Sequence, residues 1–226
     1  KVRALHEAGI RVHLHCFEYG RSRQPALEKI CEKVHYYRRH TSKANLFNSL
    51  PYIVLSRKSE ELIKNLLKDD HPVLLEGLHC CAVLHDERLK QRTIFVRPHN
   101  VEHFYYTGLA GAEKNVFKKY YFYNEASKLK YFEPVLKKAA GILAISRSDA
   151  LYFSSGYPNV WHVPAFHPNS QFTGCHGCGR FALYHGNLGV GENNEAALFL
   201  VNRVFNDLDF PFVIAGSRPS SELRKA

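Results

Sequence analysis

The sequence contains no methionine and a single tryptophan among its 226 residues. Its apolar runs are short as well, and the longest, 139–145 and 196–201, fall far below the roughly 18 residues that a helix needs to span a bilayer. We therefore expect no membrane-spanning segment. The opening residues 1–8 have a helical pattern without signal-peptide features. With the missing methionine, they lead us to expect a fragment of a longer protein.

Several catalytic and binding signatures are absent. No G-x-S-x-G motif marks a serine hydrolase, and no helix-turn-helix, zinc-finger or RRM pattern marks a nucleic-acid binder. Cys80 and Cys81 lie in an apolar run, which predicts buried thiols in a reducing cytosol. Cys175 and Cys178 have zinc-like C-x-x-C spacing, but no second pair follows. We expect ordinary thiols in a glycine-rich loop there, and no metal.

The charge is unevenly distributed. The net charge of +10 resides in residues 1–170, which hold 26 Lys and Arg against 16 Asp and Glu, whereas residues 171–226 hold five of each. This asymmetry predicts two domains. A basic first domain could attract nucleic acid, anionic lipid or phosphorylated small molecules, or could serve solubility alone. The segment 114–138 interleaves lysines with aromatic residues, which fits a membrane surface or a plain solvated helix face.

Short apolar segments alternate with helical patterns along the chain, which predicts an α/β fold with parallel sheets. The predicted strands are 10–16, 34–37, 72–77, 93–97, 142–146, 160–163, 181–185 and 211–215, and the main predicted helices are 59–68, 114–140 with a kink at Pro134, a helix from Arg147, and 195–204. Leu62, Ile63, Leu66 and Leu67 are expected inward on helix 59–68. His13 and His15 share one face of the first strand; with no carboxylate partner visible, we expect a wet face there, not metal ligands.

Polar residues follow four predicted strands, at 76–79, 97–102, 146–149 and 186–194. Ligands bind at the carboxyl ends of parallel strands, so these segments are the candidate sites. The glycines at 186–191 allow close backbone approach at a helix N-terminus, although they do not match the G-x-G-x-x-G fingerprint. Ser146 and Arg147 are weaker candidates, because serine before a helix is a common N-cap.

The order of these motifs resembles the GT-B glycosyltransferases, most closely family four, the retaining nucleotide-sugar transferases. The resemblance is carried by Ala8-Gly9-Ile10-Arg11-Val12, Glu76-Gly77-Leu78-His79, Arg97-Pro98-His99-Asn100-Val101-Glu102, Ile145-Ser146 and Tyr184-His185-Gly186-Asn187-Leu188. It implies two Rossmann-like domains facing a cleft. Residues 1–164 would form an acceptor-side domain that is incomplete at its start, 165–180 a linker, and 181–226 the start of a truncated donor-side domain.

The resemblance also implies roles for individual residues. His99 matches the catalytic histidine that faces the sugar, although a packing role is the alternative. Glu76, Gly77, Asn100 and Glu102 are the acceptor-binding candidates. Glu102 could instead cap the next helix, and Glu76 could make a local hydrogen bond. The donor-binding candidates are Gly186, Asn187, Gly189 and Asn193.

The implied activity is sugar transfer, with retention of configuration, from a nucleotide-sugar donor to a saccharide or lipid-linked acceptor. It implies no metal or cofactor, a cytoplasmic location with an anionic inner membrane surface as a candidate partner, and no nucleic acid. The family's first strand would precede Lys1, its paired glutamates would follow Ala226, and its Arg and Lys are replaced by Asn187 and Asn193. These departures keep two alternatives open: a non-catalytic GT-B binding protein and a GT-B sugar-nucleotide epimerase.

Overall fold

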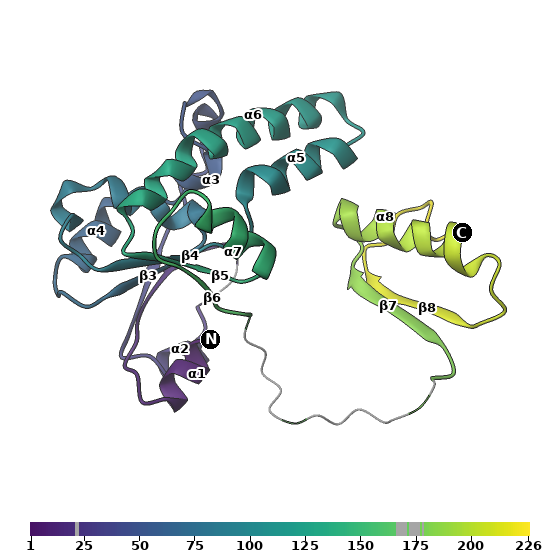
Figure 1. Cartoon of the computed structure of the whole chain (residues 1–226), viewed down its shortest axis with the longest axis horizontal. Coiled ribbons are helices and arrows are strands. Elements are labelled where there is room, and N and C mark those ends of the chain that lie inside the picture. The colour runs from purple at the N-terminus through teal and green to yellow at the C-terminus, as the bar shows by residue number, and fades with distance from the viewer. Residues whose placement is uncertain (21–22, 166–170, 172–176, 178) are drawn as a thin grey trace. The chain divides into compact units, whose positions relative to one another are not determined.

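A computed structural model of the chain describes residues 1–20, 23–165, 171, 177 and 179–226. The chain divides into two compact units (Figure 1). Unit 1 comprises Lys1–Tyr106 and Asn124–Pro168, and unit 2 comprises Thr107–Tyr123 and Asn169–Ala226. Most of the predicted linker 165–180, including Cys175 and Cys178, lies outside the described residues.

Eight strands and eight α-helices are described, together with 3₁₀ segments and one π-helical segment. The strands are β1 (His13–Phe17), β2 (Lys33–Tyr37), β3 (Val73–Glu76), β4 (Ile94–Arg97), β5 (Gly141–Ala144), β6 (Val160–His162), β7 (Ala182–Asn187) and β8 (Phe212–Ser217). The α-helices are α1 (Val2–Glu7), α2 (Pro25–Glu28), α3 (Tyr52–Leu55), α4 (Glu60–Leu66), α5 (Glu102–Ala112), α6 (Val116–Phe132), α7 (Arg147–Ser154) and α8 (Gly191–Phe199). The 3₁₀ segments are η1 (Lys43–Phe47), η2 (Leu78–His85), η3 (Glu87–Leu89) and η4 (Glu133–Lys138), and the π segment is η5 (Leu200–Phe205).

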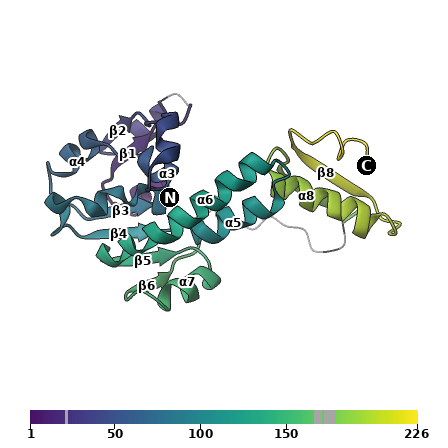
Figure 2. The same cartoon turned by 90° about the horizontal axis from the view of Figure 1, so that it is seen from above.

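Every strand pairing among the described residues is parallel, as predicted. Unit 1 has a two-stranded sheet, β1-β2, and a four-stranded sheet in the order β3-β4-β5-β6. Figure 2 shows the latter from above, with α7 beside β5 and β6. Because the strands are parallel, the carboxyl ends of β3 and β4 lie together, and Glu76 pairs in register with Arg97. This edge therefore brings the predicted acceptor-side residues together.

The core of unit 1 lies between the sheets and their helices. Val96 of β4, Ile142 of β5 and Leu129 of α6 are at most 1% exposed. Ser59 caps α4, its hydroxyl accepting the Leu62 N–H at 3.2 Å. The prediction that Leu67 points inward is wrong, because α4 ends at Leu66 and Leu67 is 43% exposed beyond the last turn.

The sequence predicted one helix over 114–140 with a kink at Pro134, and the structure instead divides this segment into two helical parts just before that proline. The α6 helix ends at Phe132, and η4 continues as a 3₁₀ turn with Pro134 in its first turn. Proline has no N–H to donate to the preceding α-helical turn. The chain then enters β5 at Gly141.

Unit 2 contains one parallel pair, β7-β8, joined through α8. Its buried hydrophobic cluster consists of Leu188, Ala197, Leu198 and Leu223. A side chain at Gly216 of β8 would collide with the Gly186 carbonyl and with Leu188. The lack of a side chain at Gly216 therefore allows the two strands to approach closely beside the β7-α8 loop.

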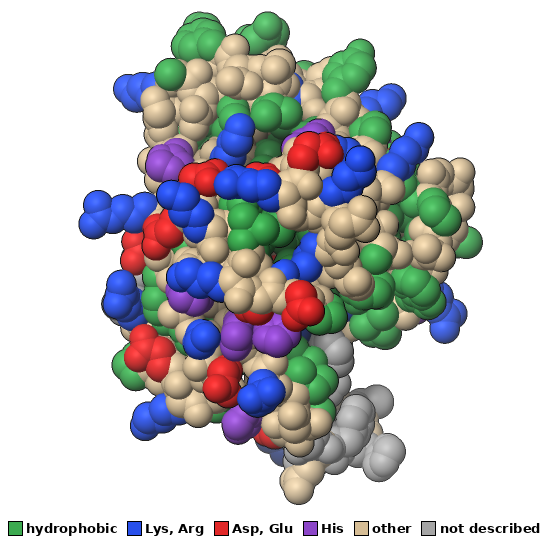
Figure 3. Space-filling view, turned by 90° about the vertical axis from the view of Figure 1, so that its left-hand side faces the viewer, with side chains coloured by type: hydrophobic (Ala, Val, Ile, Leu, Met, Phe, Trp, Pro, Cys, Tyr) green, Lys and Arg blue, Asp and Glu red, His purple; other side chains and the backbone are tan. Residues whose placement is uncertain are grey.

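Within the described residues, no helix combines the length and apolar content needed to cross a membrane. On the face seen in Figure 3, basic and acidic side chains are interspersed, and histidines gather in the lower half of the view. On this face the positive charge does not form one continuous stripe.

Candidate functional site

The first candidate site begins with an ion pair at the carboxyl ends of β3 and β4. Glu76 is the last residue of β3, and its Oε2 lies 3.0 Å from Nε2 of His99, two residues after β4. The Lys1 ammonium donates to the same carboxylate oxygen. Burial opposes the ionisation of Glu76, but hydrogen bonds from His99 and Lys1 outweigh it and lower the pKa to about 2. The carboxylate is therefore ionised at neutral pH and orients the imidazole of His99.

Gly77 turns the chain directly after Glu76. Its φ of 93° lies in the left-handed region, and an added Cβ would collide with the imidazole of His79. Glycine is thus required twice, by the backbone angle and by the ring packed against it. The Gly77 candidate has this structural role, whether or not an acceptor also touches its backbone.

His79 was part of the segment that the sequence singled out, but it was not one of the predicted site residues. Its ring lies 6.1 Å from that of His99, centroid to centroid, at an interplanar angle of 64°. Burial lowers the pKa of His79 to about 4, with further lowering from Arg57, His99 and Arg39. This imidazole is neutral at pH 7, so it can donate one hydrogen bond and accept another.

Two arginines near His79 were missed by the sequence analysis. Arg39 lies two residues after β2, and its guanidinium donates to the Ser56 hydroxyl at 3.0 Å. Arg57 donates to the Ile53 carbonyl at 2.8 Å. Burial lowers the pKa of Arg57, and the charge of Arg39 lowers it further. Arg39 and Arg57 therefore place two cations near His79, which follows the carboxyl end of β3.

Arg39 also lines an open pocket beyond β1 and β2. The pocket is formed by Glu18, Tyr19, Gly20, Arg38, Arg39 and Thr41. The guanidinium of Arg39 lies 4.4 Å from the centroid of the Tyr19 ring, a cation–π arrangement. The rule that ligands bind at strand ends could have indicated this pocket, because Arg38 and Arg39 directly follow the predicted strand 34–37.

The remaining acceptor-side candidates differ in accessibility. Glu102 stands in the first turn of α5 and is 7% exposed, and burial raises its pKa. Asn100 is exposed. Ser146 has the capping role considered from the sequence, since its hydroxyl accepts the Asp149 N–H at 3.1 Å. Arg147 is the exposed first residue of α7.

Arg97, another residue of the motif, is almost completely buried at 2% exposure. Its guanidinium donates to the carbonyls of Val163 at 3.1 Å and Pro164 at 2.9 Å. The end of β4 is thereby tied to the segment that follows β6. Arg97 supports the position of His99 without itself being open to a ligand.

The second candidate site is the loop from β7 to α8 in unit 2. The Asn187 Oδ1 accepts the Gly189 N–H at 3.1 Å and the Ser217 hydroxyl at 3.2 Å. The Asn193 side chain donates to the Asn187 carbonyl at 3.1 Å. Both asparagines therefore brace the loop internally. No side-chain hydrogen bond caps the N-terminus of α8, which leaves its first N–H groups for an anion.

A cation that the sequence analysis did not consider lies beside this loop. Arg218 directly follows β8, has a φ of 57° and is exposed. A Cβ placed on Gly189 would lie 3.2 Å from the Cβ of Arg218, so the two residues are close neighbours. A left-handed angle at a non-glycine residue is uncommon and recurs at functional sites. The rule that ligands bind at strand ends would have selected Arg218.

Comparison with known proteins adds one relative. The chain is 31% identical over 215 residues to the "Uncharacterized 44.6 kDa protein in cps region" of Klebsiella pneumoniae. The aligned part covers 88% of the chain and 54% of that protein, so the chain spans about half the length of the relative. No protein-family model matches the chain.

The cysteines do not form a nucleophilic site among the described residues. Cys16, Cys31, Cys80 and Cys81 are free thiols. Burial raises the pKa of Cys80 to about 11 and that of Cys81 well above its usual range. The prediction of buried thiols is confirmed for Cys81, whereas Cys80 is half-buried. A thiol that stays protonated is a poor nucleophile.

Proposed function

We propose that this chain is part of a retaining GT-B glycosyltransferase of the family-four type that acts in the synthesis of a surface polysaccharide. Residues 1–164 would form the acceptor-side domain, 165–180 the linker and 181–226 the start of the donor-side domain. The observation that carries the proposal is His99 held by Glu76 at the carboxyl edge of a parallel sheet. The relative from a cps region, the name given to capsule polysaccharide gene clusters, supports the same context.

On the acceptor side, His99 is the proposed catalytic residue. Its Nε2 is directed to Glu76, so the other ring nitrogen is the one left to bond a sugar hydroxyl or the charge that develops in the transition state. Glu76 is then a positioning residue. Arg39 and Arg57 would bind an anionic acceptor, such as a phosphate-linked or acidic saccharide.

On the donor side, the positive charge that Arg and Lys supply in the resembling enzymes would come from other groups. The N–H groups of α8 and the guanidinium of Arg218 would bind the donor diphosphate, while Asn187 and Asn193 hold the loop in shape. In the proposed reaction the sugar–phosphate bond breaks as the bond to the acceptor oxygen forms. The departing phosphate takes the proton of the acceptor hydroxyl, so no cofactor is consumed.

The donor site can be tested by ligand-induced stabilisation of the full-length protein. We expect one of UDP, GDP or ADP to raise the melting temperature, because a ligand at about 100 times its Kd adds roughly 2.7 kcal/mol. Arg218→Ala should remove most of this shift. Arg203→Ala, which removes an exposed arginine of η5, is the matched control and should keep it. The absence of a shift with every nucleotide would contradict the donor assignment.

The second candidate function is a GT-B protein that binds sugar nucleotides without transferring the sugar. Asn187 and Asn193 favour it, since they stand where the resembling enzymes have cations. Transfer from a labelled nucleotide sugar in the full-length protein separates the two functions. Loss of transfer in His99→Ala with unchanged nucleotide binding supports the enzyme, whereas binding without any turnover in the wild type supports the second candidate.

Association with an anionic membrane surface is a further part of the proposal. Phe117 of α6 is 86% exposed and Tyr120 is 75% exposed, and Lys118 and Lys119 lie between them in the sequence. Aromatic side chains and lysines together favour the headgroup region of an anionic bilayer. Flotation with phosphatidylglycerol vesicles should be weakened by Phe117→Ala/Tyr120→Ala. Phe47→Ala, at a residue 93% exposed in η1, is the control, and equal losses would contradict this surface.

A further inference from the structure

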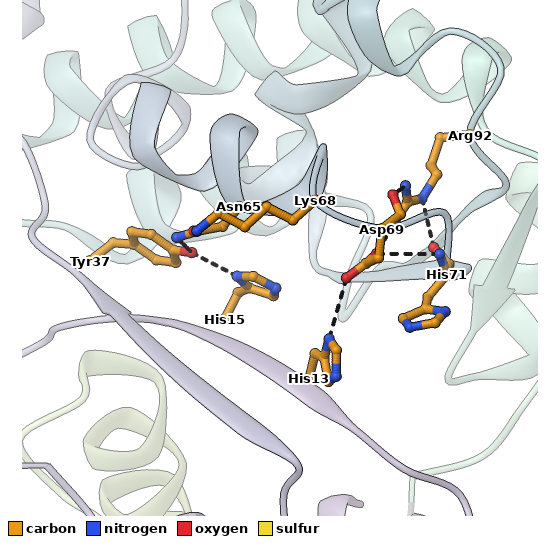
Figure 4. A network of polar contacts seen from close by, with 8 residues as sticks. All are labelled: His13, His15, Tyr37, Asn65, Lys68, Asp69, His71 and Arg92. Carbon is orange, nitrogen blue, oxygen red and sulfur yellow. Dashed lines mark hydrogen bonds and ion pairs between the residues drawn. The ribbon is translucent and has the colours of Figure 1, made fainter.

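Three side chains that can ligate metals meet at the opposite end of the strands from the acceptor-side candidates. His13 begins β1, and Asp69 and His71 precede β3 (Figure 4). One ligand atom from each lies within 4.8 Å of the others. The Nδ1 of His13 is 3.3 Å from the Oδ2 of Asp69, and the two imidazole centroids are 5.3 Å apart at 73°. The sequence analysis expected no carboxylate partner for His13, and Asp69 corrects that expectation.

Arg92 holds the loop that carries two of these side chains. Its guanidinium donates to the Asp69 Oδ1 and to the Asp69 carbonyl, and its Nε donates to the His71 carbonyl at 2.7 Å. The His71 N–H donates to the same Oδ1 at 3.3 Å. Oδ1 is thus engaged within the loop, whereas Oδ2 is directed to His13. A carboxylate fixed in this way is a preoriented monodentate ligand.

The spacing fits a tetrahedral zinc site. With zinc–ligand bonds of roughly 2.0–2.1 Å, two ligand atoms of a tetrahedron stand about 3.3 Å apart, which is the distance already present between His13 and Asp69. His71 is exposed, so its ring can rotate to close the wider side. Two imidazoles and one carboxylate are a ligand set that Zn²⁺ accepts, with water in the fourth position.

We propose that His13, Asp69 and His71 bind a Zn²⁺ ion that links the start of β1 to the loop before β3. His15, two residues along β1, is not a member of the site because its Nδ1 is hydrogen-bonded to the Tyr37 hydroxyl at 2.7 Å. The amide of Asn65 donates to the same hydroxyl at 2.9 Å, and Lys68 donates to Asn65 (Figure 4).

This zinc ion has a structural role and takes no part in the proposed sugar transfer. It lies at the amino ends of β1 and β3, whereas Glu76 is the last residue of β3 and His99 follows the carboxyl end of β4. It would join two sheets that share no strand pairing among the described residues. Binding to the native state alone would raise the stability of unit 1.

The test is calorimetric titration of ZnCl₂ into the full-length protein after treatment with a chelator. It uses a Cys175→Ser/Cys178→Ser background, so that the C-x-x-C segment cannot bind the metal. We expect one Zn²⁺ per chain and a loss of affinity of about tenfold or more in His71→Ala. His40→Ala, which also removes an exposed histidine, is the control and should leave the affinity unchanged.

Spectroscopy with Co²⁺ gives a second measurement. Cobalt in the site should show the visible bands of tetrahedral coordination without a thiolate charge-transfer band, and His71→Ala should lose them. Circular dichroism in the absence of metal checks that this variant still folds. Failure of the background protein to bind Zn²⁺, or equal affinity in His71→Ala and His40→Ala, would overturn the proposal.

Discussion

The two units build their candidate sites by different means. All six buried polar or charged residues of the described chain belong to unit 1: Ser56, Arg97, Glu102, His103, Glu125 and Glu133. The loop from β7 to α8 in unit 2 is instead shaped by glycines and by two asparagines that bond to neighbouring backbone. In unit 1, site geometry therefore depends on the packed core, whereas in unit 2 it depends on local hydrogen bonds. Substitutions at the site of unit 1 should therefore lower the stability of the whole unit, whereas substitutions at the loop of unit 2 should change only the loop.

The largest effect is expected from Glu125→Ala in unit 1. Glu125 is completely buried, and it accepts the Tyr52 N–H at 2.6 Å and the Lys128 ammonium at 2.8 Å. Removing the carboxylate leaves the partly buried Lys128 ammonium and the Tyr52 N–H without this partner, which should cost about 3 kcal/mol or more of unfolding free energy. Urea denaturation measures it.

Glu87→Ala is the matched control for that variant. The Glu87 side chain is 74% exposed and lies 3.8 Å from Lys90. An exposed pair of this kind contributes about 0–1 kcal/mol. If the two glutamate variants lost the same stability, the contrast between buried and local interactions would fail.

Gly77→Ala should have the next largest effect. The new side chain must adopt a left-handed backbone angle and displace the His79 ring, at a cost of about 2–3 kcal/mol. The proposed transfer activity should fall as well, because His79 lies beside His99. Gly156→Ala, where a Cβ would meet nothing within 4 Å, serves as the control in the same denaturation assay.

The fold was largely accessible from the sequence, because short apolar runs separated by helical patterns are typical of parallel strands. Burial along most of the strand, which that pattern implies, holds for β4 and β5, whereas β7 and β8 have exposed positions. Ser59 marked the start of a helix, and Pro134 marked an interruption of the predicted helix 114–140, for local reasons that need no tertiary information. Leu67 shows the limit of periodicity, since the pattern continues one residue beyond the end of α4.

The sites were accessible in part. Glu76 and His99 could be placed at one sheet edge from strand order, but their 3.0 Å contact could not be predicted. Arg57 and Asp69 escaped notice because neither immediately follows a strand; each comes close to its neighbours only through tertiary packing. Arg218 follows a strand that was predicted from the sequence, so the sequence alone was sufficient to select it as a candidate.

In unit 2, Asn187→Ala should have a smaller and more local effect. The variant loses the acceptor for the Gly189 N–H and the Ser217 hydroxyl, about 1 kcal/mol of stability in an exposed loop. Nucleotide binding should fall more than stability does, because the loop shape sets the position of the α8 N–H groups. Asn206→Ala removes an exposed side-chain contact elsewhere and should change neither. A loss as large as that of Glu125→Ala would show that the loop is coupled to a wider core.

The smallest effect concerns the pH dependence of Glu76. Its folded pKa of about 2 lies below the usual 4.5, so its contribution to stability is present above the usual value and is lost as the pH falls towards 2. The side chain is 36% exposed, and solvent screening should hold that contribution to less than about 1 kcal/mol. Wild type should exceed Glu76→Gln in urea resistance at neutral pH, and the difference should shrink below about pH 4.5 and vanish only as the pH reaches about 2. High salt should shrink the difference at neutral pH, since the partners Lys1 and His99 are also partly exposed. Parallel stability profiles across this pH range would mean that the Glu76–His99 pair does not hold the site at this edge, and His99 would then have to be positioned by packing against His79 alone.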